Sequence, residues 1–163
     1  MANTCFNRIS VSGGTAAEIS AFLLEVAGPE GPLDFNVILP VPEIYENIYS
    51  GFSRIDGQQV RHWYEETDAQ GRSINARKLN DDEIRQLNEI GFMSCYDWKC
   101  AHWGCKWNAD NVMVERHETS AMITFETPWE PPMPLVEELR ERFLGLQITA
   151  FFDEPLMLIG GYY

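Results

Sequence analysis

The N-terminal segment shows two hydrophobic patterns in succession, first that of a strand and then that of a helix. Apolar and polar side chains alternate over residues 5–12, which is typical of a half-buried strand. Thr15 and Glu18 then have the spacing of a capping box, and apolar residues follow at helical spacing until Gly28. The pattern predicts a strand over 5–12 and a helix between Thr15 and Gly28.

The C-terminal segment has an equally clear pattern. Two alternating stretches flank a Glu-Thr pair, and the proline-rich residues 127–132 that follow are expected to form an ordered loop. Pro134 suits the first turn of a helix, whose apolar residues recur until Gly145. The expected elements are a hairpin of strands over 112–117 and 122–125, a helix over 134–144, and strands over 146–152 and 156–163 about a turn at 153–155.

The middle of the chain is less regular. Four prolines limit residues 28–53 to short extended pieces such as 35–39. Residues 54–78 are polar and weakly periodic, and the pattern assigns no element to them. Asn80 precedes three acidic residues and an apolar repeat that stops at Gly91, which predicts a short amphipathic helix.

The order of these elements indicates a fold class. A strand and a helix, followed after an interruption by two strands, a helix and a strand, is the split βαβ order of the ferredoxin-like fold. We therefore expect an α+β protein with an antiparallel sheet and helices on one face. The whole chain, 1–163, is expected to form a single domain, with its core over about 3–27 and 110–163 and an insertion over about 28–109.

Charge excludes two classes of partner. The chain carries 25 acidic and 12 basic residues, for a net charge of −13. Nucleic acid and anionic membranes both bind clustered Lys and Arg, so direct binding to either is not expected. Because the N-terminus has no secretory pattern and no window is apolar enough to span a membrane, we expect a cytoplasmic protein.

Acidic side chains form the first candidate binding surface. Carboxylates are often only solvated surface charges, and that alternative stays open. The sharper hypothesis is a surface that presents carboxylates like the phosphates of a duplex and occupies a basic groove of another protein. Residues 51–90 are nearly balanced, with eight acids and six bases, so the excess lies elsewhere. The candidates are Glu126, Glu130, Glu137, Glu138, Glu141, Asp153 and Glu154.

Aromatic side chains form a second candidate. A segment rich in tryptophan could stack on a base or nucleotide, since an aromatic face accepts any base. The alternative is that these rings bury the face of the sheet. The residues concerned are Tyr96, Trp98, Trp103, Lys106 and Trp107.

Cysteine and histidine supply candidate ligands for a metal. Cys95, Cys100 and Cys105 surround His102, but zinc sites pair their ligands at shorter spacing and set the pairs well apart. The spacing favours thiols packed as small hydrophobes, so we expect no metal and no cofactor. A pair of Cys100 or Cys105 with His102 is poor evidence for catalysis, and no nucleophile motif or phosphate loop is present. A non-enzymatic protein is expected.

Several segments carry a resemblance to a known family. They are Asn3–Gly13, Phe35–Pro42, Tyr96–Trp98 with His102–Asn108, Phe125–Pro134 and Phe152–Pro155. On these segments the chain resembles the ferredoxin-like domain of the YubB-type proteins of phages and plasmids. The resemblance implies a ferredoxin-like fold and a mobile-element origin, and it implies no activity. Family members usually carry Thr in place of Cys105, which weakens a zinc site further, and a small residue in place of Leu156.

Charge, motifs and resemblance together predict an acidic interaction protein of a phage or plasmid. The expected partner is a basic, nucleic-acid-handling defence complex of the bacterial host cell, such as a CRISPR effector or a restriction enzyme. Binding between opposite charges is expected to be fast and sensitive to salt. The alternatives are a small-ligand or nucleotide-binding module built on the aromatic segment, a small enzyme whose site is assembled from scattered residues, and an oligomeric structural protein.

Overall fold

Strand β1 (Thr4–Ser12) lies in the middle of an antiparallel sheet. In the computed structural model, which describes residues 3–163, the order of this five-stranded sheet is β5-β6-β1-β7-β8. The other strands are β5 (Asp110–Arg116), β6 (Ser120–Pro128), β7 (Gln147–Glu154) and β8 (Ile159–Tyr162). β1 pairs with β6 on one side and with β7 on the other, both antiparallel.

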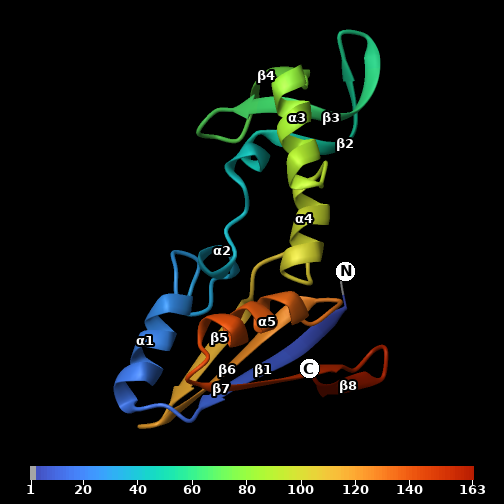
Figure 1. The fold of residues 1–163 in the computed structure, drawn as a ribbon. Helices are drawn as coiled ribbons and strands as arrows, with labels where there is room; N and C mark the ends of the chain where they lie inside the picture. Colours follow the sequence, from blue (N-terminus) through green and yellow to red (C-terminus); the bar gives the residue numbers. More distant parts are fainter. Residues whose placement is uncertain (1–2) are drawn as a thin grey trace. The chain divides into compact units, whose positions relative to one another are not determined.

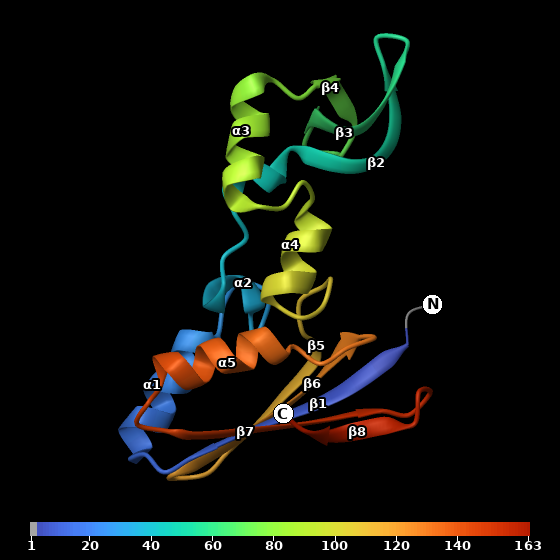
Figure 2. The same ribbon diagram turned by 45° about the vertical axis from the view of Figure 1, so that its right-hand side comes forward.

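Two helices cover one face of this sheet. Helix α1 (Ala16–Val26) follows β1, and helix α5 (Met133–Arg142) connects β6 to β7. Both lie over the same face in Figures 1 and 2. The element order and the sheet order together are those of the split βαβ plan, so the prediction of a ferredoxin-like α+β fold is confirmed.

The core of this unit lies between the sheet and its helices. Residues at alternate positions of the strands point to the helices, and the apolar stripes of α1 and α5 meet them. The ring of Phe143, just after α5, packs edge-on against that of Phe22, with the ring centroids 4.9 Å apart. The buried apolar side chains include Ile9, Val11, Phe22, Ile123, Leu135, Leu139 and Ala150.

The chain divides into two compact units. One comprises the described residues up to Pro40 together with Lys99–Tyr163, and the other comprises Val41–Trp98. Helix α4 (Cys95–His102) begins in the second unit and ends in the first. Residues 28–40 and 99–109, which the sequence pattern assigns to the insertion, therefore belong to the unit that holds the ferredoxin-like sheet.

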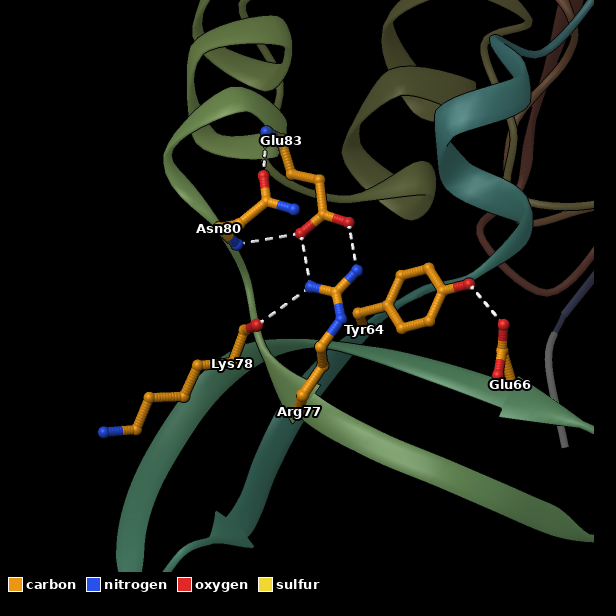
Figure 3. Close-up of polar contacts among 6 residues, drawn as sticks. All are labelled: Tyr64, Glu66, Arg77, Lys78, Asn80 and Glu83. Atoms are coloured by element: carbon orange, nitrogen blue, oxygen red, sulfur yellow. Dashed lines mark hydrogen bonds and ion pairs between the residues drawn. The ribbon is translucent and has the colours of Figure 1, made fainter.

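The second unit is built on a smaller sheet. Its strands, in the order β2-β3-β4, are Ile48–Ile55, Gln58–Thr67 and Ser73–Lys78. A 3-10 helix, η1 (Glu43–Glu46), precedes them and helix α3 (Asp81–Ile90) follows them. Figure 3 shows Arg77 of β4 reaching Glu83 of α3 through two hydrogen bonds, of 2.7 and 2.8 Å. Helix α3 follows Asn80, as the pattern predicted, and Asn80 and Glu83 form a capping box at its start.

Three expectations from the pattern are wrong. Residues 35–39 are not extended, because Phe35–Ile38 form a short helix, α2, capped by the side chain of Asp34. Residues 28–53 are not limited to extended pieces, because they also contain α2 and the 3-10 helix η1. Helix α5 ends at Arg142, so Leu144 lies outside it and is 87% exposed.

The final hairpin also differs from its predicted boundaries. β7 continues to Glu154, so Asp153 and Glu154 belong to a strand and not to a turn. The turn consists of Pro155–Leu158, and only then does β8 begin. Among the described residues, no helix has the length and the apolar character needed to cross a membrane.

Candidate functional site

The face of the large sheet that the helices leave uncovered carries two of the predicted acidic residues. Phe6 of β1 lies opposite Glu126 of β6 and opposite Asp153 of β7. Alternation along β1 turns Cys5 and Asn7 toward the helices, where both are buried, and Phe6 away from them. The phenyl ring of Phe6 is 47% exposed, with one carboxylate from each neighbouring strand beside it.

The next set of cross-strand pairs on the same face includes a cationic side chain. Arg8 lies opposite Thr124 and Phe151, with its guanidinium 5.3 Å from the centre of the Phe151 ring. We call the surface formed by Phe6, Arg8, Thr124, Glu126, Phe151 and Asp153 the open face. It contains a hollow of about 350 Å³, which Met113 and Asn111 of β5 also line. The hollow is therefore lined both by aromatic rings and by charged side chains.

The charges of the two carboxylates on the open face are not offset by an ion pair among the described residues. Within residues 3–163, neither Glu126 nor Asp153 forms an ion pair. The cation of the same surface, Arg8, is placed over a ring and not on a carboxylate. A cationic group from a partner would thus find two carboxylates without ion pairs next to an apolar surface.

The remaining predicted acidic residues lie elsewhere. Glu137 and Glu138 are on α5, on the opposite side of the sheet, where Glu137 pairs with Arg140 and Glu138 pairs with Arg142 at 2.9 Å. Glu141 is on the same helix and Glu130 is in the loop before it; both are exposed. The predicted set is therefore divided between two faces.

Glu154 does not belong to an acidic surface. It is fully buried, because it follows Asp153 on β7 and alternation turns it to the other side. Its Oε2 atom accepts a hydrogen bond from the backbone N–H of Met157, and among the described residues its Oε1 atom has no hydrogen-bond partner. The prediction placed it in a turn, where its side chain would have been exposed.

The structure places the aromatic segment mainly in the interior. Trp98 and Trp103 are buried, and the indole N–H of Trp103 donates to the carbonyl oxygen of Leu39 at 2.8 Å. Tyr96 and Trp107 are exposed, and the ammonium of Lys106 lies 3.8 Å from the centre of the Trp107 ring. The two buried indoles offer no open face on which a base could stack.

The two buried thiols, those of Cys5 and Cys105, are not activated. All four cysteines are free. Burial raises the pKa of Cys5 to about 11 and that of Cys105 to about 12, so both thiols remain protonated at neutral pH. Over residues 3–163, no three side chains of His, Cys, Asp or Glu are grouped in a way that could hold a metal ion.

Comparisons with known proteins agree with this fold. Residues 102–163 match the profile of a family described as the ferredoxin-like domain in Api92-like protein. This segment resembles an Api92-like domain. The crystal structure of a protein Api92 from Yersinia pseudotuberculosis is similar to this chain with a TM-score of 0.50 and 15% sequence identity, over 99% of this chain and 93% of that one. At that identity the similarity concerns the fold alone. No curated protein matches the chain.

Sequence reasoning missed the apolar part of the open face. Phe6, Met113 and Phe151 were not candidates, although Phe6 is an apolar residue at a position of β1 that otherwise carries polar side chains. That exception to the alternation was a usable signal. The pattern predicts a strand from Leu156 onward, and this prediction hides the exposure of the side chains of Leu156–Leu158, which lie in a turn.

Proposed function

We propose that this chain is a non-enzymatic interaction protein that binds a basic partner protein through the open face. The observation that carries the proposal is the row Glu126, Phe6 and Asp153, in which two carboxylates without ion pairs flank an exposed ring. Opposite charges speed association and select the partner, and an aromatic ring adds both apolar contact and cation–π attraction.

The distribution of charge supports this assignment. The unit with the large sheet carries 14 acidic and 6 basic residues, and the unit formed by Val41–Trp98 carries 11 and 6. Both units are therefore acidic, and no large part of the chain attracts nucleic acid. On α5 two of the acids are neutralised by neighbouring arginines, whereas those of the open face are not.

The partner class that we propose is a nucleic-acid-handling complex of a bacterial defence system, such as a CRISPR effector or a restriction enzyme. Such complexes carry grooves lined with Lys and Arg that receive phosphates, and carboxylates can occupy the same positions. An origin in a phage or plasmid, which the YubB-type resemblance implies, is part of this proposal.

The test uses purified defence complexes and the full chain. We expect the chain to reduce binding of target DNA by at least one of these complexes at low salt and to lose this effect at high salt. The double variant E126K/D153K should lose inhibition, whereas E118K, which alters an exposed acid in the β5–β6 turn, should retain it. An affinity that does not change with salt, or equal loss in both variants, would contradict the proposal.

A further inference from the structure

The turn between β7 and β8 exposes an unbroken run of large apolar side chains. Leu156 is 73% exposed and Leu158 is 90% exposed, and Met157 and Ile159 are exposed as well. Isolated apolar residues on a surface are ordinary, but a contiguous group of them marks a site of interaction. We call residues Leu156–Ile159 the apolar tip.

Two hydrogen bonds order the backbone of the apolar tip. The buried carboxyl group of Glu154 accepts a hydrogen bond from the N–H of Met157, and Leu158 donates to the carbonyl oxygen of Pro155. Leu158 adopts a left-handed backbone conformation, with φ at 56°, which is uncommon for a residue other than glycine. Pro155 itself restricts the chain at the start of the turn. The apolar tip is thus an ordered turn.

Burial of the Glu154 carboxyl group orders the β7–β8 turn but reduces the stability of the fold. One of the two oxygens of Glu154 has no partner among the described residues, and burial of an unsatisfied polar group reduces stability. The hydrogen bond to Met157 orders the backbone that presents the apolar tip. The Glu154 carboxyl group therefore supports the shape of the apolar tip and lowers the stability of the fold.

The apolar tip and the open face meet at one end of the sheet. Glu154 pairs with Ile159 across the β7–β8 hairpin, and the adjacent Asp153 pairs with Phe6. In Figures 1 and 2 the β7–β8 turn lies at the end of the sheet where β1 begins. The turn that carries Leu156, Met157 and Leu158 therefore starts two residues after Asp153, at the end of the sheet that also holds Phe6 and Glu126.

We infer that the apolar tip is the anchor of the interface, which inserts into an apolar cleft of the partner protein while Lys or Arg side chains at the rim of that cleft meet Asp153 and Glu126. This inference rests on the proposed function and adds the shape of the partner to its charge. An apolar centre with a polar rim is the usual anatomy of a protein interface. The net charge of −13 opposes both an anionic membrane and a second copy of the chain as the occupant.

The experiment maps binding on the isotope-labelled full chain by NMR. The probe is a synthetic amphipathic helix of Leu and Lys, and its matched control is the same helix with Glu in place of Lys. We expect the Leu/Lys helix to shift amide signals of the apolar tip and of Phe6, Glu126 and Asp153, and the Leu/Glu helix to leave them in place. Shifts confined to α5 or to the unit of β2–β4 would overturn the inference.

Variants separate the apolar anchor from the charges. We expect L156S/L158N to weaken binding of the Leu/Lys helix roughly tenfold. Asn is chosen at 158 because it tolerates the left-handed conformation. The control is L144S, which removes an equally exposed leucine from another surface and should bind normally. Normal binding by L156S/L158N, or equal loss in L144S, would overturn the inference.

The outcomes also distinguish this inference from the proposed function. If the wild-type chain fails to bind both the Leu/Lys helix and the defence complexes, both fail. If E126K/D153K abolishes binding and L156S/L158N does not, the tip is no anchor and the proposed function stands. Dimers in sedimentation, or binding to phosphatidylcholine vesicles, that L156S/L158N abolishes would identify a second copy or a membrane as the occupant and overturn the inference.

Discussion

At the scale of single residues, the space around a Cα atom determines which side chains can occupy that position. Gly104 has φ at 88°, and a Cβ atom added there would lie 2.9 Å from the carbonyl oxygen of Pro131 and 2.9 Å from Cδ of Pro134. Both are backbone or ring atoms that cannot swing away. Close packing of this loop against the start of α5 therefore requires glycine.

This position yields a prediction with a matched control. G104A should reduce the free energy of unfolding by about 3 kcal/mol, because it combines a left-handed backbone with a steric clash. Gly13 has nearly the same φ, 87°, but the atom nearest to a Cβ added there belongs to the flexible side chain of Gln147. G13A should therefore reduce the free energy of unfolding by only about 1 kcal/mol. Urea unfolding measures both, and equal losses would contradict the role of the clash.

At the scale of elements, one ion pair joins β4 to α3. Arg77 donates to both carboxylate oxygens of Glu83, and its guanidinium also lies 4.0 Å from the centre of the Tyr64 ring (Figure 3). The hydrogen bonds from Arg77 hold the pKa of Glu83 below its ordinary value of 4.5. Glu83 also closes the capping box of α3, so a single carboxylate fixes the start of the helix and its place on the sheet.

The pH dependence of this pair follows from the sign of the shift. Because the folded-state pKa of Glu83 is lowered, its contribution is complete above pH 4.5 and is lost as the pH falls through the lower value. R77Q should cost up to about 1 kcal/mol at neutral pH, and its difference from the wild type should shrink in acid. Unfolding at several pH values tests this.

A neighbouring ion pair provides the control for that experiment. Arg85 and Asp82, both on α3, form a pair whose side chains are largely exposed, so R85Q should change stability very little at any pH. If R77Q and R85Q changed the stability equally, the ion pair between β4 and α3 would contribute no more than an exposed ion pair.

At the scale of the whole molecule, each compact unit has a core drawn from its own residues. The core of the ferredoxin-like unit includes Ile9, Phe22, Ile123 and Leu135, and that of Val41–Trp98 includes Leu87. Domains with separate cores can in principle fold separately. The insertion therefore carries its own fold and is more than a long loop.

Excision of the second unit tests this independence. Replacing Val41–Trp98 by a flexible Gly/Ser linker should leave the ferredoxin-like unit folded, because its sheet, α1 and α5 all lie outside the removed segment. Amide NMR signals of β1, β6 and β7 should keep the positions that they have in the full chain. Collapse of the signal dispersion would show that the first unit depends on the second.

Local patterns were predictable from the sequence, and contacts between distant segments were not. The capping box at Thr15 and the helix start after Asn80 were predicted because the residues that form each of them lie within one helical turn. The short helix at Phe35–Ile38 was missed although Asp34 caps it locally, and the hydrogen bond from the backbone N–H of Phe35 to the side chain of Asn108, far along the chain, has no signal in the local pattern. A tertiary contact of this kind overrides a local preference for extended structure.

By itself, the sequence determined the ferredoxin-like order of elements and the acidic character of the chain, since periodicity and charge are properties of neighbouring residues and of composition. Only the tertiary structure decided which carboxylates share a surface. A strand that runs two residues further than expected turned Asp153 outward and Glu154 inward. Strand register brought Glu126 and Asp153 to the two sides of Phe6, because pairing depends on hydrogen bonds between segments far apart in the chain.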